Sequence, residues 1–561
     1  MNGASITATL ERHVTVPEGY RRACRLLGLS PPAETVLGGS YVLAVVLWLL
    51  GLAALTLAGG TVGTVVGTGT LTAAVGLALA GRYGVPLAAQ ARRIRALGAA
   101  PSLVATLVLG MTLWPSAERA AAFAAAAGDG LLTDSLETHR DRASGTPRSG
   151  LEAFGTEWRE WFPALDRSMR DVQRAAAGTA DERATLLSSA RRGILDGTRD
   201  EMAGFAAELR SPATALYAFG VLLPLAFVAL LPAVGAAGIR LTPALLVVTY
   251  GIVLPAGLVV ASGWLLAQRP VAFPPAGIPR SHPDVPSDPH SAMMAGLLVA
   301  AGAWMLATVI LPVWAPPIAA LGGGTGAALV VYYRPVKQVR EYIDSVEEGL
   351  PEALAAVGRR VDRGESVETA LEATVEETPG PLASVLAETV ERQRTLGTDV
   401  ESAFRGKYGS LDTLPSPRLR RAAVLLGAAA DIGPPAGETI TTMGDHLSEL
   451  AEVERATRRD LAQVTGTLSN TAALFGPLVG GATVAMSATM GSTGPIESVS
   501  PAALGPVVGW YCLVLAAVLT ALSTGLHSGL DRARVGYRVG VAVCAATATY
   551  FAAVVGTGLL V

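Results

Sequence analysis

The residues of this sequence that could do chemistry are arginines in short clusters within a carboxylate-rich stretch. They are Arg392, Arg394, Arg418, Arg420 and Arg421. A guanidinium pairs with a carboxylate through two parallel hydrogen bonds, so these side chains could dock an acidic partner surface. The alternative is a solvated helix face whose arginines pair within the chain, as Glu388 and Arg392 could at a spacing of four. We take the five arginines as candidate partner-contact residues.

Constellations that would indicate an enzyme or a metal site are missing from the sequence. No Gly-x-x-x-x-Gly-Lys-Ser/Thr loop occurs, so the chain is not expected to be its own motor. His282 and His290 flank a proline-rich run, and that spacing gives them no common helix face for a metal. Cys24, Cys512 and Cys544 are far apart and indicate neither a disulfide framework nor a zinc site. We expect no catalytic residue, cofactor or metal.

The composition indicates that the lipid bilayer is the main solvent. Of the 561 residues 51% are hydrophobic and 16% are charged, and the mean hydropathy is +0.44, which is too apolar for a soluble enzyme of this length. Most of the charges lie in two segments, around 82–210 and 334–465. The net charge of −3 gives no reason to expect nucleic acid as a partner.

Nine apolar runs are long enough to cross a hydrocarbon core about 30 Å thick. They are 40–58, 61–80, 213–236, 243–267, 292–312, 316–333, 467–490, 502–525 and 538–559. Arginine and lysine gather beside the ends that would share one side, which marks that side as cytoplasmic. We therefore expect a multi-pass protein of the cytoplasmic membrane, with its N-terminus and both large charged segments in the cytoplasm.

These runs divide the chain into eight segments. In order they are a cytoplasmic N-terminal segment (1–39), a transmembrane hairpin (40–80), a cytoplasmic helical domain (81–212), a second hairpin (213–267), a proline-rich linker (268–291), a third hairpin (292–333), a second cytoplasmic helical domain (334–466) and three transmembrane helices (467–559). Both charged segments have apolar residues at helical spacing, interrupted by glycine and proline. We predict an all-α polytopic membrane protein whose two helical-bundle domains form a tandem repeat.

Within the first charged segment, helices are expected near 117–127, 150–175 and 181–208, with a loop at 143–149. The second charged segment resembles the type II secretion system F domain. Residues 350–354 (Leu-Pro-Glu-Ala-Leu) and 364–371 (Gly-Glu-Ser-Val-Glu-Thr-Ala-Leu) are similar to the helix start and the turn with which that domain opens. The resemblance covers about 334–490 and is weaker over 103–236.

The whole chain looks like the archaeal or tight-adherence branch of this family, the platform proteins of type IV pilus-like machines. The resemblance implies a non-enzymatic protein that contacts a hexameric secretion ATPase and pilin-like subunits and that forms homo-oligomers. The filament could be a pilus, an archaellum or a secretion pseudopilus. In this interpretation the run 455–460 (Arg-Ala-Thr-Arg-Arg-Asp), which leads to the span at 467, would be the mechanical junction.

Two other classes of protein stay open. A polytopic permease or channel-like transporter is the alternative, although ion-coupled transporters keep ionisable residues near the membrane midplane and none of the nine runs has one there. A membrane enzyme is the third possibility, but it would need a reactive cluster that the sequence does not offer.

Overall fold

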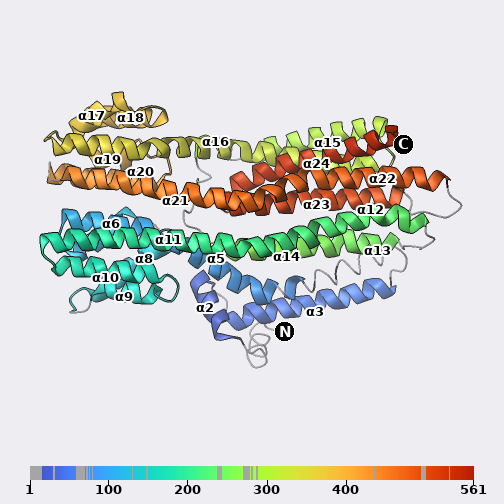
Figure 1. Ribbon diagram of the computed structural model, residues 1–561, viewed down its shortest axis with the longest axis horizontal. Helices are drawn as coiled ribbons and strands as arrows, with labels where there is room; N and C mark the ends of the chain where they lie inside the picture. Colours follow the sequence, from blue (N-terminus) through green and yellow to red (C-terminus); the bar gives the residue numbers. More distant parts are fainter. Residues whose placement is uncertain are drawn as a thin grey trace.

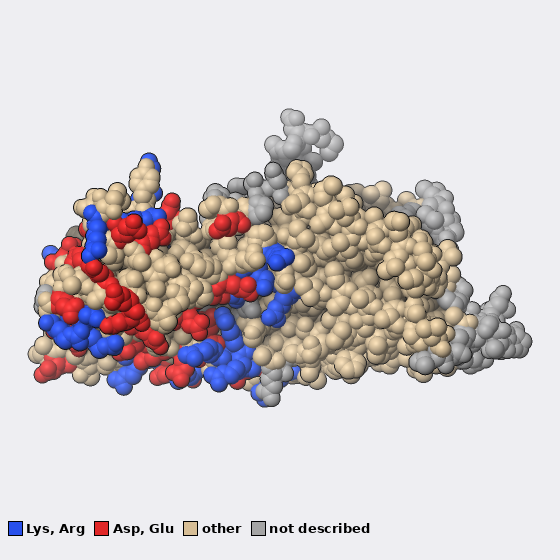
Figure 2. Space-filling model, turned by 90° about the horizontal axis from the view of Figure 1, so that it is seen from above, with Lys and Arg blue, Asp and Glu red and all other residues tan. Residues whose placement is uncertain are grey.

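The computed structural model describes residues 16–29, 32–57, 80–128, 130–146, 149–236, 243–268, 282–285, 289–433, 436–493, 501–529 and 531–560, together with residues 70, 74, 76–78 and 278. Within these ranges the chain is 88% helical and has no strands. The helices lie along one long axis (Figure 1). One end of the molecule carries the Lys, Arg, Asp and Glu side chains, and the other end shows almost none (Figure 2). We call these ends the charged half and the apolar half.

Eight helices are long and apolar enough to cross a membrane. They are Ala33–Ala53, Ala180–Leu230, Ala244–Gln268, His290–Ile310, Ala315–Asp362, Thr465–Ala488, Ala502–His527 and Arg532–Leu559. Each overlaps one of the nine predicted spans. The remaining prediction, 61–80, and the tight turn expected before it fall almost entirely outside the described residues.

The N-terminal part contains α2 (Glu18–Leu27), α3 (Ala33–Leu57), η1 (Ala80–Gly84) and α5 (Val85–Leu97). The first charged unit follows. It consists of α6 (Ala100–Leu113), α7 (Ala117–Ala127), α8 (Leu131–Ala143), α9 (Gly150–Trp158), α10 (Pro163–Ala177) and α11 (Ala180–Tyr217). The start of α11 is fixed by a capping box, in which Thr179 and Glu182 each satisfy a backbone N–H of the other. The predicted helix over 150–175 is divided, because the chain turns between Trp158 and Pro163.

The first apolar hairpin contains α11, η2 (Ala218–Leu222) and α12 (Leu223–Ala236), then α13 (Pro243–Val248), η3 (Thr249–Val253) and α14 (Leu254–Gln268). Part of the predicted linker is packed rather than free. His282 is buried, and its Nε2 atom lies 2.9 Å from the carbonyl oxygen of Thr413 in the second charged unit. This contact ties the segment between the two halves of the chain to the fold.

The second charged unit begins in the middle of a helix. α15 (His290–Ile310) is followed by α16 (Ala315–Asp362), one continuous helix of 48 residues that contains Pro335 and Pro351. The unit continues with α17 (Val367–Glu377), α18 (Pro381–Leu396), α19 (Val400–Arg405), α20 (Pro417–Ile432) and α21 (Gly437–Asn470). α21 leads through η5 (Thr471–Phe475) into α22 (Gly476–Thr493), before α23 (Pro501–Ser528) and α24 (Arg532–Leu560).

Buried apolar side chains form two large clusters, one in each half. The core of the charged half includes residues of both charged units, such as Leu107, Ile194 and Leu354, so the two units share one core. α11 and α21 run side by side where the units meet (Figure 1). The core of the apolar half is centred on α23, whose Tyr511, Leu515 and Leu519 are completely buried.

Small residues allow α16 to lie between two helices of the apolar half. A Cβ atom on Gly324 would approach the Cβ of Ala300 on α15 to 2.7 Å, and one on Gly326 would approach the carbonyl oxygen of Gly540 on α24 to 2.8 Å. Only glycine permits such close backbone approach. Gly480 on α22 is likewise used in packing against α23, as expected from its spacing to Gly476.

Candidate functional site

Charged residues recur on α16 where the helix passes from the apolar into the charged half. Arg340, Asp344 and Glu347 follow one another at spacings of four and three, which places them on one face of the helix. Each pairs with a residue of another element. We call this set of ion pairs the junction: Arg340, Asp344, Glu347, Arg418, Glu454, Asp531 and Arg534.

The innermost pair joins α16 to the start of α24. The Nε atom of Arg340 donates to Oδ2 of Asp531 at 3.0 Å, and each residue is only 6% exposed. Oδ1 of Asp531 accepts from the backbone N–H of Ala533 at 2.9 Å, so the same carboxylate also caps α24. Because both charges are buried, removing either one would leave the other unpaired in a medium that solvates it poorly.

A second pair lies beside the first, since Arg534 of α24 donates to Asp344 of α16. Lys337 of α16 pairs with Glu341 at 2.9 Å, and its ammonium group lies 4.7 Å from the centre of the Tyr537 ring. Such a cation above an aromatic face is attracted by the ring. Together these contacts attach one side of α16 to the first turns of α24.

The third part of the junction joins α16, α20 and α21 through Arg418. Its guanidinium lies 3.2 Å from a carboxylate oxygen of Glu347 and 2.9 Å from one of Glu454. The hydroxyl of Ser416 donates to Glu347 and accepts from the N–H of Leu419, which caps α20. Burial raises the pKa of Glu347, which lies in the charged half, although Arg418 and Ser416 oppose the shift.

The structure gives the five predicted arginines different surroundings. Arg392 pairs with Glu388 and donates to the carbonyl of Tyr408, as the solvated-face interpretation expected for the first pair. Arg394 pairs with Glu372, but its side chain is 65% exposed. Arg418 belongs to the junction, whereas Arg420 and Arg421 are half-buried on α20. The five therefore do not form one continuous docking face.

The run predicted as a mechanical junction lies inside α21 and contributes through its neighbour. Arg458 pairs with Glu454, the acid that also holds Arg418. The acids of the junction were not singled out by sequence reasoning, although the spacing of 340, 344 and 347 was a visible signal. Their partners were not visible, because Arg340 and Asp531 are 191 positions apart.

A buried histidine lies near the contact of the two charged units. His446 of α21 is 2% exposed, and neither ring nitrogen has a hydrogen-bond partner. Burial lowers its pKa to about 3, and the nearby Arg191 and Arg421 lower it in the same direction. Arg191 of α11 itself pairs with Glu449 of α21 at 2.7 Å. His446 is therefore neutral at physiological pH.

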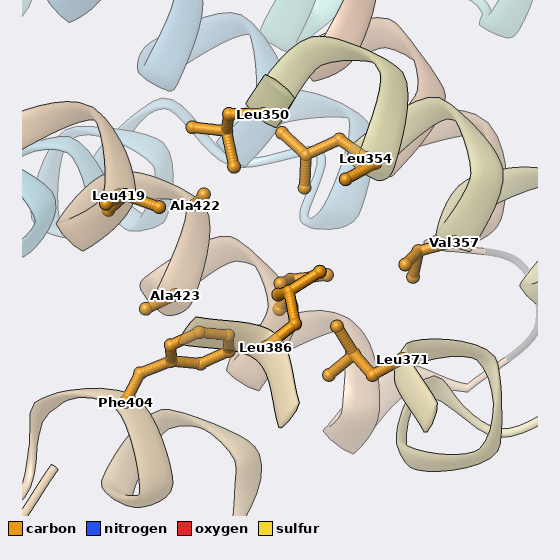
Figure 3. Close-up of a pocket in the computed structure, with 11 residues that line it drawn as sticks. Leu350, Leu354, Val357, Leu371, Leu386, Phe404, Leu419, Ala422 and Ala423 are labelled. Atoms are coloured by element: carbon orange, nitrogen blue, oxygen red, sulfur yellow. The ribbon is translucent and has the colours of Figure 1, made fainter. Parts of the chain in front are cut away.

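A small cavity lies inside the second charged unit. Its lining is formed by apolar side chains of α16 to α20, among them Leu354, Leu371, Leu386 and Phe404 (Figure 3). No polar side chain points into it, so it offers nothing to orient a ligand. Among the described residues there is also no group of three or more His, Cys, Asp or Glu that could hold a metal ion.

Fold and junction define an all-helical chain with eight candidate membrane spans, whose charged and apolar halves are joined by ion pairs. No protein-family model, curated protein or solved structure matches this chain. What the protein does is therefore inferred from its own residues.

Proposed function

We propose that the chain is the membrane platform of a type IV pilus-like machine, which couples a cytoplasmic secretion ATPase to the movement of pilin-like subunits. One observation carries this proposal. Three helical paths, α11 to α12, α16, and α21 to α22, run from the charged half into the apolar half. At about 1.5 Å per residue, α16 alone extends about 72 Å. A displacement of the charged half would therefore be transmitted to the apolar half.

The order of helices supports a tandem repeat of two domains. α7 and α17 each have 11 residues and each follows a serine N-cap, Ser116 or Ser366. α8 and α18 each follow a glycine with positive φ, Gly130 at 106° or Gly380 at 78°. Turns of this kind recur at matching places because each unit needs the same reversals of chain direction.

The later helices of the two units correspond as well. α10 and α20 both begin with a proline in the first turn, Pro163 or Pro417, and both end at a glycine. α11 and α21 are the longest helices that follow, and each enters the apolar half through a π-helical turn. In the proposal, each unit is an F-type domain on the cytoplasmic side, and 61–80 supplies the ninth span.

The proposal is tested by purifying the tagged protein from native membranes in mild detergent and identifying what accompanies it by mass spectrometry. We expect a hexameric secretion ATPase and pilin-like subunits. Arg394→Glu should abolish ATPase recovery, because this side chain is exposed on the second unit. Arg174→Glu is the matched control, since Arg174 is 67% exposed on the first unit and also pairs with an acid.

Arg418 is not a useful position for this test, since its loss would leave Glu347 and Glu454 unpaired and disturb the fold. Recovery of neither ATPase nor pilin, together with solute uptake into proteoliposomes, would contradict the platform and favour the permease. Recovery of the ATPase with both charge-reversal variants would keep the platform and move the docking surface away from Arg394.

A further inference from the structure

Every π-helical turn in the described part of the chain stands directly before a proline. The turns are η1 (Ala80–Gly84), η2 (Ala218–Leu222), η3 (Thr249–Val253) and η5 (Thr471–Phe475), and the prolines two residues further on are Pro86, Pro224, Pro255 and Pro477. Proline has no N–H, and its ring presses on the carbonyl four residues earlier. Widening one turn relieves that clash, so the prolines account for the π-helical turns.

The widened turn leaves a carbonyl without its helical partner, and in an apolar surrounding this carbonyl needs another donor. In η2 the carbonyl four residues before Pro224 belongs to Gly220. It accepts a hydrogen bond from the hydroxyl of Tyr511 at 2.7 Å. In η3 the carbonyl four residues before Pro255 belongs to Gly251, and it accepts from the indole N–H of Trp510 at 3.3 Å. Two consecutive residues of α23 thus serve both turns.

A third aromatic residue connects the two turns to each other. Tyr250 lies within η3, and its hydroxyl donates to the carbonyl of Pro224, directly after η2, at 2.9 Å. The rings of Tyr250 and Tyr511 meet edge to face, with centroids 5.5 Å apart. A Cβ atom on Gly220 would approach Leu258 of α14 to 2.7 Å, so this glycine permits the close contact of η2 with α14. Three donors therefore join three spans in one closed network.

We infer that η2 and η3 form a paired hinge and that Tyr250, Trp510 and Tyr511 are the lock that holds it in the conformation seen here. Each turn has a proline that prevents it from becoming a regular α-helix, and each depends on α23 for a hydrogen bond. α12 and α14 consequently change angle together, and only when the donors of α23 release them. The inference concerns the apolar half and does not rest on the proposed platform function.

The test uses the full chain in lipid nanodiscs and measures amide hydrogen exchange in the segments 218–224 and 249–255 by mass spectrometry. Tyr511→Phe removes the hydroxyl and keeps the ring. Loss of one hydrogen bond is expected to speed exchange in 218–224 about two- to tenfold. Tyr550→Phe is the matched control, because its buried hydroxyl donates at 2.7 Å to Gly505, a carbonyl outside the π-helical turns. It should leave both segments unchanged.

A second background separates the lock from ordinary packing. Pro224→Ala supplies the missing N–H, so the turn can become α-helical and Gly220 regains a backbone partner. Tyr511→Phe should then have no further effect on 218–224. An equal effect of Tyr511→Phe with and without Pro224 would overturn the inference, as would no effect in either background. If Tyr511→Phe does not fold, Trp510→Phe tests the other arm, with faster exchange expected in 249–255 alone.

Discussion

The two charged units have the same order of helices, but they are attached to the apolar half differently. The first unit enters it through one long helix, α11, whereas the second enters it through both α16 and α21. The second unit also has the buried pair of Arg340 with Asp531, which fixes α16 to α24. Similar bundles can thus differ in how firmly they are held, because the attachment depends on a few contacts outside the repeated helices.

The buried acids of the two units show this difference at the level of single residues. Asp166 of the first unit is 2% exposed and is held by Arg159 at 2.9 Å and Arg170 at 2.8 Å. Those two arginines are about half exposed, so they can return to water if the acid is lost. Arg340 of the second unit has no such access, since its side chain is 8% exposed.

Neutralising these acids should give the largest effect and the clearest contrast. Asp531→Asn leaves Arg340 buried without its counter-charge, and we expect a loss of about 3 to 5 kcal/mol in the free energy of unfolding. Asp166→Asn, the matched variant, should lose about 1 to 3 kcal/mol. Denaturant unfolding in bicelles measures both. Equal losses would show that the exposure of the arginines does not decide the effect.

Glycine contacts should separate the tightly packed second unit from a tolerant site in the same helix. A Cβ on Gly358 of α16 would lie 2.7 Å from the carbonyl oxygen of Gly437 and 2.7 Å from the backbone N of Thr441. Because backbone atoms cannot move aside, Gly358→Ala should cost about 3 kcal/mol. Gly349→Ala is the control, since it meets only the flexible side chain of Leu382, at 3.3 Å. A similar loss for both variants would contradict the close approach of α16 and α21.

Acid should weaken the contact between the two units through His446. Its pKa is lowered to about 3 in the folded chain, against an ordinary value of 6.5. Above pH 6.5 the imidazole is neutral in both states and stability is complete. As the pH falls towards 3, only the unfolded chain takes up the proton, so stability declines by about 1.4 kcal/mol per pH unit, or about 2 kcal/mol at pH 5. His446→Leu should remove this part of the pH dependence, and an unchanged slope would exclude His446 as its source.

The smallest expected effect is a gain in the first unit. Gly193 lies inside α11, and a Cβ atom there would meet nothing within 4 Å. Gly193→Ala should therefore stabilise the chain by about 0.5 to 1 kcal/mol through helix propensity alone. Thermal unfolding followed by circular dichroism would measure it. A decrease in stability would mean that α11 has a contact at this position that the structure lacks.

Apolar run length predicted most of the spans, because a helix that crosses lipid must satisfy all its own backbone hydrogen bonds. The limits of α16 were not predicted. Pro351, within the run that resembles a helix start, lies inside this helix, and so does Pro335. A proline in a helix interior costs about 3 kcal/mol. Packing of α16 against α15, α21 and α24 outweighs that cost, and such packing is not visible in local sequence.

The junction could be predicted only in part for a related reason. Clusters containing Arg340 and Arg534 were visible as basic residues beside apolar runs, whereas the acids that pair with them come from elements about 190 positions away. Side-chain spacing identifies partners within one helix, such as Glu388 and Arg392, but not partners brought together by the tertiary fold. The hydrogen bonds of Trp510 and Tyr511 were unpredictable on the same ground.

The unbroken course of α16 imposes a strict rotational phase on the chain. Gly324 and Gly326 set the angle of this helix in the apolar half, and Arg340 and Glu347 must then face their partners at that same angle. One residue inserted between them would turn the remainder of α16 by about 100° and advance it by about 1.5 Å. Seven inserted residues would restore the angle but move Arg340 about 10 Å from Asp531. Chains that share this fold are therefore expected to vary in length at their loops and to keep this stretch of α16 constant.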